Sequence, residues 1–131
     1  MNATSKPIAP AAEILRLLGD ASIEVTVRDR DSANVLSGRI PRGARVHITH
    51  LPNDSYLDIV AQAKALAGND FEPIPHIAVR SLRSGAELDD YLARMLGEAG
   101  VTRVLLIAGD LDPPRGPFTA SLDALKTGLF E

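Results

Sequence analysis

The chain has 131 residues with 14 Lys and Arg against 17 Asp and Glu, a formal net charge of −3, and no Cys. This length suits one domain with a core of its own, and the mild acidity without a Lys/Arg block argues against a nucleic-acid partner. The lack of Cys excludes disulfides, thiolate zinc sites and cysteine nucleophiles.

The N-terminal region predicts an arm and a first helix over residues 1–20. Residues 1–8 are polar and interrupted by proline, and apolar side chains then recur at near-helical spacing up to Gly19. The region lacks the pattern of a signal peptide, and no later stretch approaches the ~20 apolar residues of a bilayer span. We therefore expect a cytoplasmic protein without a membrane partner.

Strand and helix patterns alternate through the first half of the remaining chain, residues 21–131. Residues 21–27 alternate as a strand does, and residues 31–38 allow two turns of helix. A second strand over 45–52 precedes a helix that we expect Asn53 or Asp54 to cap. Its predicted buried face comprises Tyr56, Ile59, Val60, Ala63 and Leu66.

The second half repeats the pattern. A third strand over 73–80 precedes a helix that we expect Ser84 to cap, with the acidic Glu87 near its start, and that ends at Gly100. The inward face of this helix should contain Leu88, Tyr91, Leu92, Met95 and Leu96. Residues 101–110 are almost wholly apolar, which is typical of a strand covered on both faces, and residues 120–131 predict a last helix.

Strands that alternate with helices at spacings of about 25 residues predict an α/β fold with a parallel sheet. Both a doubly wound sheet and a barrel fit this pattern. A complete (β/α)8 barrel needs at least ~200 residues, so a barrel would be represented by about half, with four strands and four to five helices. The helical pattern still continues at Glu131, which we interpret as truncation.

Polar side chains at strand ends are the candidates for chemistry, because ligands of parallel sheets collect at the carboxyl ends of the strands. Thr49, His76 and Asp110 lie at or near such ends, and Glu24 opposes the Ile/Val face of the first strand. Each also has a structural interpretation. Glu24 would be an exposed acid on an edge strand, His76 a hydrogen-bonded core imidazole, and Asp110 a loop cap.

Two standard ligand-binding patterns are absent. His47 and His50 form an H-x-x-H pattern, but three residues along a strand place the rings on opposite faces, so we expect no metal site. The A-G-D-L-D-P-P segment at residues 108–114 lacks the spacing of a dinucleotide fingerprint or a phosphate loop.

Five motifs occur in an order that resembles a known family. They are S-I-E-V-T (22–26), V-H-I-T (46–49), P-H-I-A-V (75–79), G-V-T-R-V-L-L-I-A-G-D-L-D-P-P (100–114) and A-S-L-D-A-L (120–125). Over residues 20–131 the chain resembles the amino-terminal half of methylenetetrahydrofolate reductase, in its short bacterial branch. The resemblance implies a TIM-barrel flavoprotein with FAD at the carboxyl ends of the strands. It would reduce 5,10-methylenetetrahydrofolate to 5-methyltetrahydrofolate with NADH or NADPH, in one-carbon metabolism and methionine biosynthesis.

The resemblance also implies roles for individual residues. Glu24 corresponds to the catalytic acid that protonates the folate, and Asp110 to an aspartate near both flavin and pterin that tunes charge during reduction. Thr49, His76, Gly109, Asp110 and Ala120 correspond to positions that contact FAD. Gly109 would let the backbone approach the cofactor.

The chain departs from the family pattern at two positions, and other functions stay open. Ala108 replaces a usual Arg, and residues 25–28 replace an aromatic run with prolines. The family's remaining FAD and folate contacts would lie beyond Glu131, so we expect the isolated chain to bind FAD weakly or not at all.

Two other functions stay open. One alternative is a non-catalytic half-barrel that self-associates or binds a partner through its open edges. Another is a related barrel enzyme with a different one-carbon substrate. Whatever its function, we expect the 131-residue chain to form a homo-oligomer, because open strand edges recruit another copy.

Overall fold

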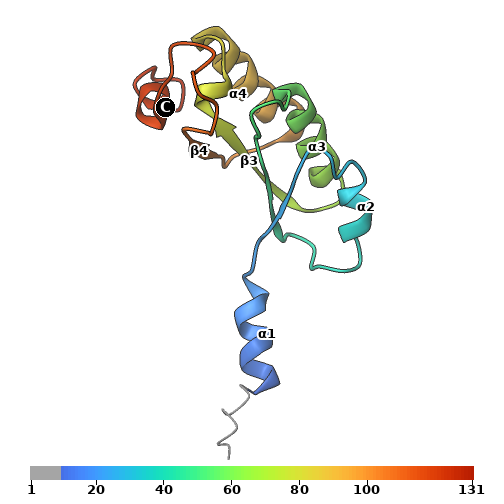
Figure 1. Cartoon of the computed structure of the whole chain (residues 1–131). Coiled ribbons are helices and arrows are strands. Elements are labelled where there is room, and N and C mark those ends of the chain that lie inside the picture. The colour runs from blue at the N-terminus through green and yellow to red at the C-terminus, as the bar shows by residue number, and fades with distance from the viewer. Residues whose placement is uncertain (1–9) are drawn as a thin grey trace, which may run out of the picture.

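A computed structural model describes residues 10–131 (Figure 1), so the arm predicted over residues 1–8 lies outside the described residues. Helices and strands alternate along the chain. In order, the elements are α1 (Ala11–Gly19), β1 (Ile23–Val25), α2 (Ser32–Leu36), β2 (Arg45–Ile48), α3 (Tyr56–Gly68), β3 (Glu72–Ala78), the 3-10 turn η1 (Val79–Ser81), α4 (Gly85–Ala99), β4 (Leu105–Ile107) and α5 (Ser121–Leu125).

The four strands form one open parallel sheet in the order β1-β2-β3-β4. This confirms the predicted α/β fold. Strand order equals chain order, as in the first half of a (β/α)8 barrel, whereas a doubly wound sheet reverses its direction at a switch point. Because the strands are parallel, the carboxyl ends of all four lie at the same end of the sheet.

Helix α3 lies against β2 and β3 and supplies much of the core. Four of the five side chains predicted to face inward are buried, and Tyr56 is half-buried. The predicted cap was wrong, because Ser55 occupies the N-cap and its Oγ accepts from the Leu57 amide at 3.3 Å. Asp54 instead accepts from the Leu51 amide at 2.9 Å and closes the turn before the helix.

Helix α4 begins and ends at capping residues that can be recognised in its sequence. Ser84 Oγ accepts from the Glu87 amide at 3.1 Å, and Gly100 ends the helix with a left-handed φ of 62°. Leu88, Tyr91 and Met95 are buried as predicted. Leu96 was wrongly assigned to the inward face and is exposed. One helical step of about 100° past Met95 turns it away from the single sheet that α4 covers.

The first two strands are shorter than the predicted 21–27 and 45–52, and a turn closed by side-chain hydrogen bonds follows β1. Asp29 Oδ2 accepts from both the amide and the hydroxyl of Thr26, at 2.8 and 3.0 Å, and this turn follows β1 directly. Those bonds lower the pKa of Asp29, with the backbone donor contributing most. Beyond the end of β2, the His50 ring is buried on the helix side of the sheet.

Strand β4 corrects a second expectation. The apolar run 101–110 predicted a strand covered on both faces, but only Leu105–Ile107 is strand, and Leu105 is 41% exposed. The reason is topological: β4 is an edge strand with β3 as its single neighbour. A continuous apolar run predicts a buried strand, but it does not show that neighbouring elements are present to cover it.

Helix α1 forms as predicted, yet none of its nine residues is buried. It projects away from the sheet (Figure 1). Its leucines at positions 15, 17 and 18 are exposed. Among the described residues, no helix combines the length and apolarity needed to cross a membrane.

Candidate functional site

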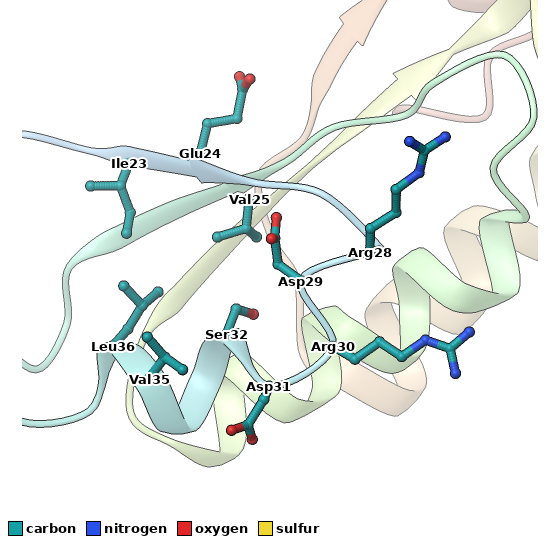
Figure 2. Close-up of a pocket in the computed structure, with 10 residues that line it drawn as sticks. All are labelled: Ile23, Glu24, Val25, Arg28, Asp29, Arg30, Asp31, Ser32, Val35 and Leu36. Carbon is teal, nitrogen blue, oxygen red and sulfur yellow. The ribbon is translucent and has the colours of Figure 1, made fainter.

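Three polar side chains meet on the face of the sheet that the helices leave uncovered. Glu24 points away from α2, whereas its strand neighbours Ile23 and Val25 point toward that helix (Figure 2). Glu24 and His47 are directly paired residues of β1 and β2. His76 lies on β3, two residues beyond Ile74, which pairs with His47. Parallel register and strand parity thus bring the three side chains together.

The three groups lie within interaction distance. His47 Nδ1 is 3.2 Å from His76 Nε2, and the two rings meet edge to face with centroids 5.4 Å apart. The same Nε2 atom lies 3.9 Å from Glu24 Oε2. His76 therefore stands between a second imidazole and a carboxylate, and we call these three side chains the Glu24–His76–His47 cluster.

Burial disfavours the protonated form of the His76 ring. The His76 side chain is almost fully buried, and this burial lowers its pKa; the Glu24 carboxylate opposes the change, and His47 adds to it. A hydrogen bond between two ring nitrogens needs one donor and one acceptor, so at least one of the two rings is neutral. The Glu24 side chain is 59% exposed to solvent.

Backbone contacts hold His76 and Thr49 in place. The Tyr91 hydroxyl donates to the His76 carbonyl oxygen at 3.1 Å, which ties β3 to α4. Thr49 directly follows β2, and its amide donates to the Val25 carbonyl at 3.0 Å. Its hydroxyl donates to the same oxygen at 3.4 Å and keeps its own oxygen available as an acceptor.

Gly109 and Asp110 follow β4 at the carboxyl end of the sheet, as predicted. Gly109 has φ +89°, and a Cβ there would lie 2.8 Å from Ala78 Cβ. The close approach of β3 is therefore sufficient to require glycine. Asp110 is exposed, and among residues 10–131 no hydrogen bond or ion pair engages its carboxylate, so it does not act as a loop cap.

Ala120 lies farther along the chain, at the N-cap of α5, and it is exposed. Its amide donates to Asp123 Oδ2 at 2.9 Å, and Thr119 donates to the same oxygen through its amide and its hydroxyl. These bonds, led by the two backbone donors, lower the pKa of Asp123. The structure gives Ala120 a role in this cap and no bond to the Glu24–His76–His47 cluster.

The two histidines of the H-x-x-H pattern lie on opposite faces, as strand parity predicted. His50 accepts from the Ala78 amide at 3.2 Å and packs edge to face on Tyr91, on the helix side. Burial lowers its pKa. In the part of the chain that the structure describes, no three His, Asp or Glu side chains are arranged to bind a metal ion.

Of the predicted site residues, Glu24 and His76 approach each other. Thr49, Gly109 and Asp110 lie at the same end of the sheet, where the strands finish. His47 was missed as a site residue. Its parity with Thr49 was visible in the sequence, but its approach to His76 depends on the register between β2 and β3, which no single strand specifies.

No model of a known protein family matches the chain. The donor set nevertheless fits a flavin: the Thr49 hydroxyl, the His76 imidazole and the Asp110 carboxylate offer separate polar contacts. Leu105 and Ile107 lie on the same face as His76 and form an uncovered apolar surface for an aromatic ring system.

Proposed function

We propose that the chain acts in the flavin-dependent reduction of 5,10-methylenetetrahydrofolate to 5-methyltetrahydrofolate, with NADH or NADPH as hydride donor. The observation that supports this most is the 3.9 Å approach of Glu24 to His76 at the carboxyl edge of a parallel sheet. These are the two positions to which the family resemblance assigns the proton donor and a flavin contact. A chance match of motifs would not require them to meet.

The protein's contribution is to position groups and to move a proton. Glu24 holds a proton on a carboxyl oxygen and donates it to the folate as the five-membered ring opens. Its exposure lets water restore that proton after each turnover. His76, kept largely neutral by burial, can offer a hydrogen bond beside the carboxyl without adding a full charge.

The bound FAD would supply hydride transfer between the nicotinamide and the folate. Thr49, His76 and Asp110 would hold it through their polar atoms, with Leu105 and Ile107 against its ring system. Because the open sheet encloses little of so large a ligand, this chain alone should hold FAD weakly.

Binding is tested by amide NMR of the 15N-labelled chain titrated with FAD. We expect shifts at residues 49–50, 76–78 and 108–110, and none around the Arg42–Asp70 ion pair at the opposite end of the sheet. Flavin should be lost on gel filtration. Unchanged spectra at millimolar FAD, or shifts confined to other residues, would contradict the proposed cofactor site.

Catalysis is tested in a version of the chain that carries a complete eight-stranded barrel, supplied with FAD, NADH and 5,10-methylenetetrahydrofolate, and 5-methyltetrahydrofolate is measured by mass spectrometry. Glu24→Gln should slow folate reduction by ~10²-fold or more, as loss of a general acid does, and leave flavin reduction by NADH nearly intact. Glu98→Gln, on the outer side of α4, is the control and should behave as the parent chain. Equal loss in both half-reactions would refute the role of Glu24, and no product above background would refute the reaction.

A further inference from the structure

A cavity on the helix side of the sheet is separate from the Glu24–His76–His47 cluster. It has a volume of about 230 Å³ and lies where the two central helices begin. Ser55 and Tyr56 line it from the start of α3, and Glu87 lines it from the first turn of α4. Arg115, in the segment after β4, also lines it. The cavity therefore lies among central elements, and no residue of the strands β1 and β4 lines it.

His50 presents a hydrogen-bond donor at this cavity. Its Nδ1 atom accepts from the Ala78 amide at 3.2 Å, so this nitrogen carries no proton. Burial lowers the pKa of the ring and keeps it neutral, and the single ring proton is therefore on Nε2. His50 is only 5% exposed and lines the cavity, yet within residues 10–131 no hydrogen bond engages Nε2. A buried donor without an acceptor is unfavourable, and an acceptor atom in the cavity would remove that cost.

Ser81 supplies a second polar atom of the same kind. It is the last residue of the turn η1, is 6% exposed and lines the same cavity. Its Oγ has no hydrogen-bond partner in the part of the chain that the structure describes. Buried polar side chains usually have partners, and here two that are more than nine-tenths buried lack one at a single cavity. This favours a polar ligand over an apolar one.

The charged side chains that line the cavity include both signs. Arg83 and Arg115 are the cations, and Asp54 and Glu87 are the anions. Asp54 Oδ2 accepts from the Leu51 amide at 2.9 Å, and Glu87 Oε2 accepts from the Arg83 amide. These backbone bonds hold both carboxylates in place and engage only one oxygen of each.

Charges of both signs also act on the His50 ring. Burial has the largest effect on its pKa; after burial, the Asp54 carboxylate raises this pKa and the Arg115 guanidinium lowers it. A simple anion at this place would be attracted by Arg115 and repelled by Asp54, and a simple cation would meet the opposite pair of effects. A small molecule that carries one charge of each sign can face both groups favourably.

We propose that this cavity binds a free α-amino acid. Its carboxylate accepts from His50 Nε2 and from Arg115, and its ammonium group donates to Asp54 and Glu87. The volume of about 230 Å³ is below the about 300–1,000 Å³ of sites for drug-sized ligands, which suits a molecule of this size. The proposal does not depend on the reaction proposed above.

The first test titrates the 15N-labelled chain with each standard L-amino acid and follows the His50 ring nitrogens and the amides of residues 81–87 by NMR. We expect at least one amino acid to shift these signals at millimolar concentration. The same molecule without its ammonium group, or without its carboxylate, should shift none of them; for L-alanine these probes are propionate and ethylamine. No shift with any amino acid would overturn the proposal. Equally tight binding of the deaminated acid or of inorganic phosphate would show a simple anion site and would also overturn it.

The second test changes the lining charges. Asp54→Asn keeps an oxygen for the Leu51 amide but removes the charge, so it should weaken amino-acid binding about tenfold or more. Arg115→Gln should weaken it similarly. Asp58→Asn, in the first turn of α3 but outside the cavity lining, is the control and should bind as the parent chain does.

The amide spectrum of each variant without ligand shows whether its fold is intact, and Arg115→Gln decides if Asp54→Asn does not fold. Unchanged affinity in a folded charge variant, or an equal loss in Asp58→Asn, would overturn the proposal.

Discussion

The centre of the sheet and its two edges both carry leucine side chains, but the centre buries them and the edges expose them. Leu66 and Leu88, on α3 and α4, are inaccessible to solvent, whereas Leu17 and Leu122, on α1 and α5, are exposed. The central helices cover strands that have neighbours on both sides, and the outer helices do not. Burial in this chain therefore follows the number of packed neighbours, and leucine content alone does not predict it.

The largest contrast should come from truncating a central side chain. Ile59 is fully buried between α3 and the sheet, so Ile59→Ala should lower the free energy of unfolding by about 2–5 kcal/mol through lost burial and a residual cavity. Leu57→Ala, two residues away on the exposed side of α3, should change it by less than about 0.5 kcal/mol. Urea denaturation followed by circular dichroism measures both.

Equal losses for the two variants would remove the distinction between the buried and exposed sides of α3. A small loss for Ile59→Ala alone would mean that the centre packs as loosely as the edges.

A second central variant connects the core to the site. Tyr91→Phe removes the hydroxyl that donates to the His76 carbonyl, and a buried acceptor that loses its donor costs about 1–3 kcal/mol. Tyr56→Phe, whose hydroxyl donates to Asp90 at 2.7 Å from a half-buried position, should cost less. Urea denaturation gives the two losses, and the ring 15N shifts of His76 should change only in Tyr91→Phe. The reverse order of losses would mean that β3 is not held by α4.

The sequence predicts the centre well because its signals there are local. The 3.6-residue spacing of Ile59, Ala63 and Leu66, the cap at Ser84 and the stop at Gly100 each depend on a few neighbouring residues, and the structure confirms them. The edges were predicted less well. The apolar residues of β4 give the same pattern whether or not a further strand covers them, so the pattern overstated its burial.

The candidate site also combines features that the local sequence predicts with contacts that depend on neighbouring strands. Strand parity alone separates Glu24 from the Ile/Val face of its strand and places His47 and His50 on opposite faces, and the structure confirms this. Which of the two faces the helices cover comes from the structure. The contact between His47 and His76 could not be derived, because it needs the offset between β2 and β3. The roles of Thr49 and Asp110 stay predictions from the resemblance.

Acid should expose a further difference, through the histidines that the core buries. Burial holds the pKa values of His50 and His76 below the ordinary 6.5 in the folded chain. The unfolded chain therefore binds more protons as pH falls below about 6.5, and stability must fall with it until the folded-state pKa is passed. The slope is at most about 1.4 kcal/mol per pH unit for each histidine.

Urea denaturation between pH 8 and pH 5 measures this loss. His50→Asn keeps an acceptor for the Ala78 amide but cannot titrate, so its stability should fall less steeply than that of the parent chain. The comparison at pH 8, where both histidines are neutral, gives the cost of the substitution itself. Parallel curves for parent and variant would show that His50 does not contribute to the acid sensitivity.

The smallest expected effect is the difference in stability between losing the N-cap of the central helix α4 and losing the N-cap of the outer helix α5. Ser84→Ala removes the acceptor for the Glu87 amide at the start of α4 and should cost about 1 kcal/mol of global stability. Asp123→Ala removes the acceptor shared by Thr119 and Ala120 at the start of α5. Because α5 is only five residues long and faces an open edge, its loss should speed local amide exchange without shifting the unfolding midpoint. Hydrogen exchange and thermal unfolding of the chain distinguish the two responses. A midpoint shift in Asp123→Ala as large as that in Ser84→Ala would show that the edge unfolds together with the centre.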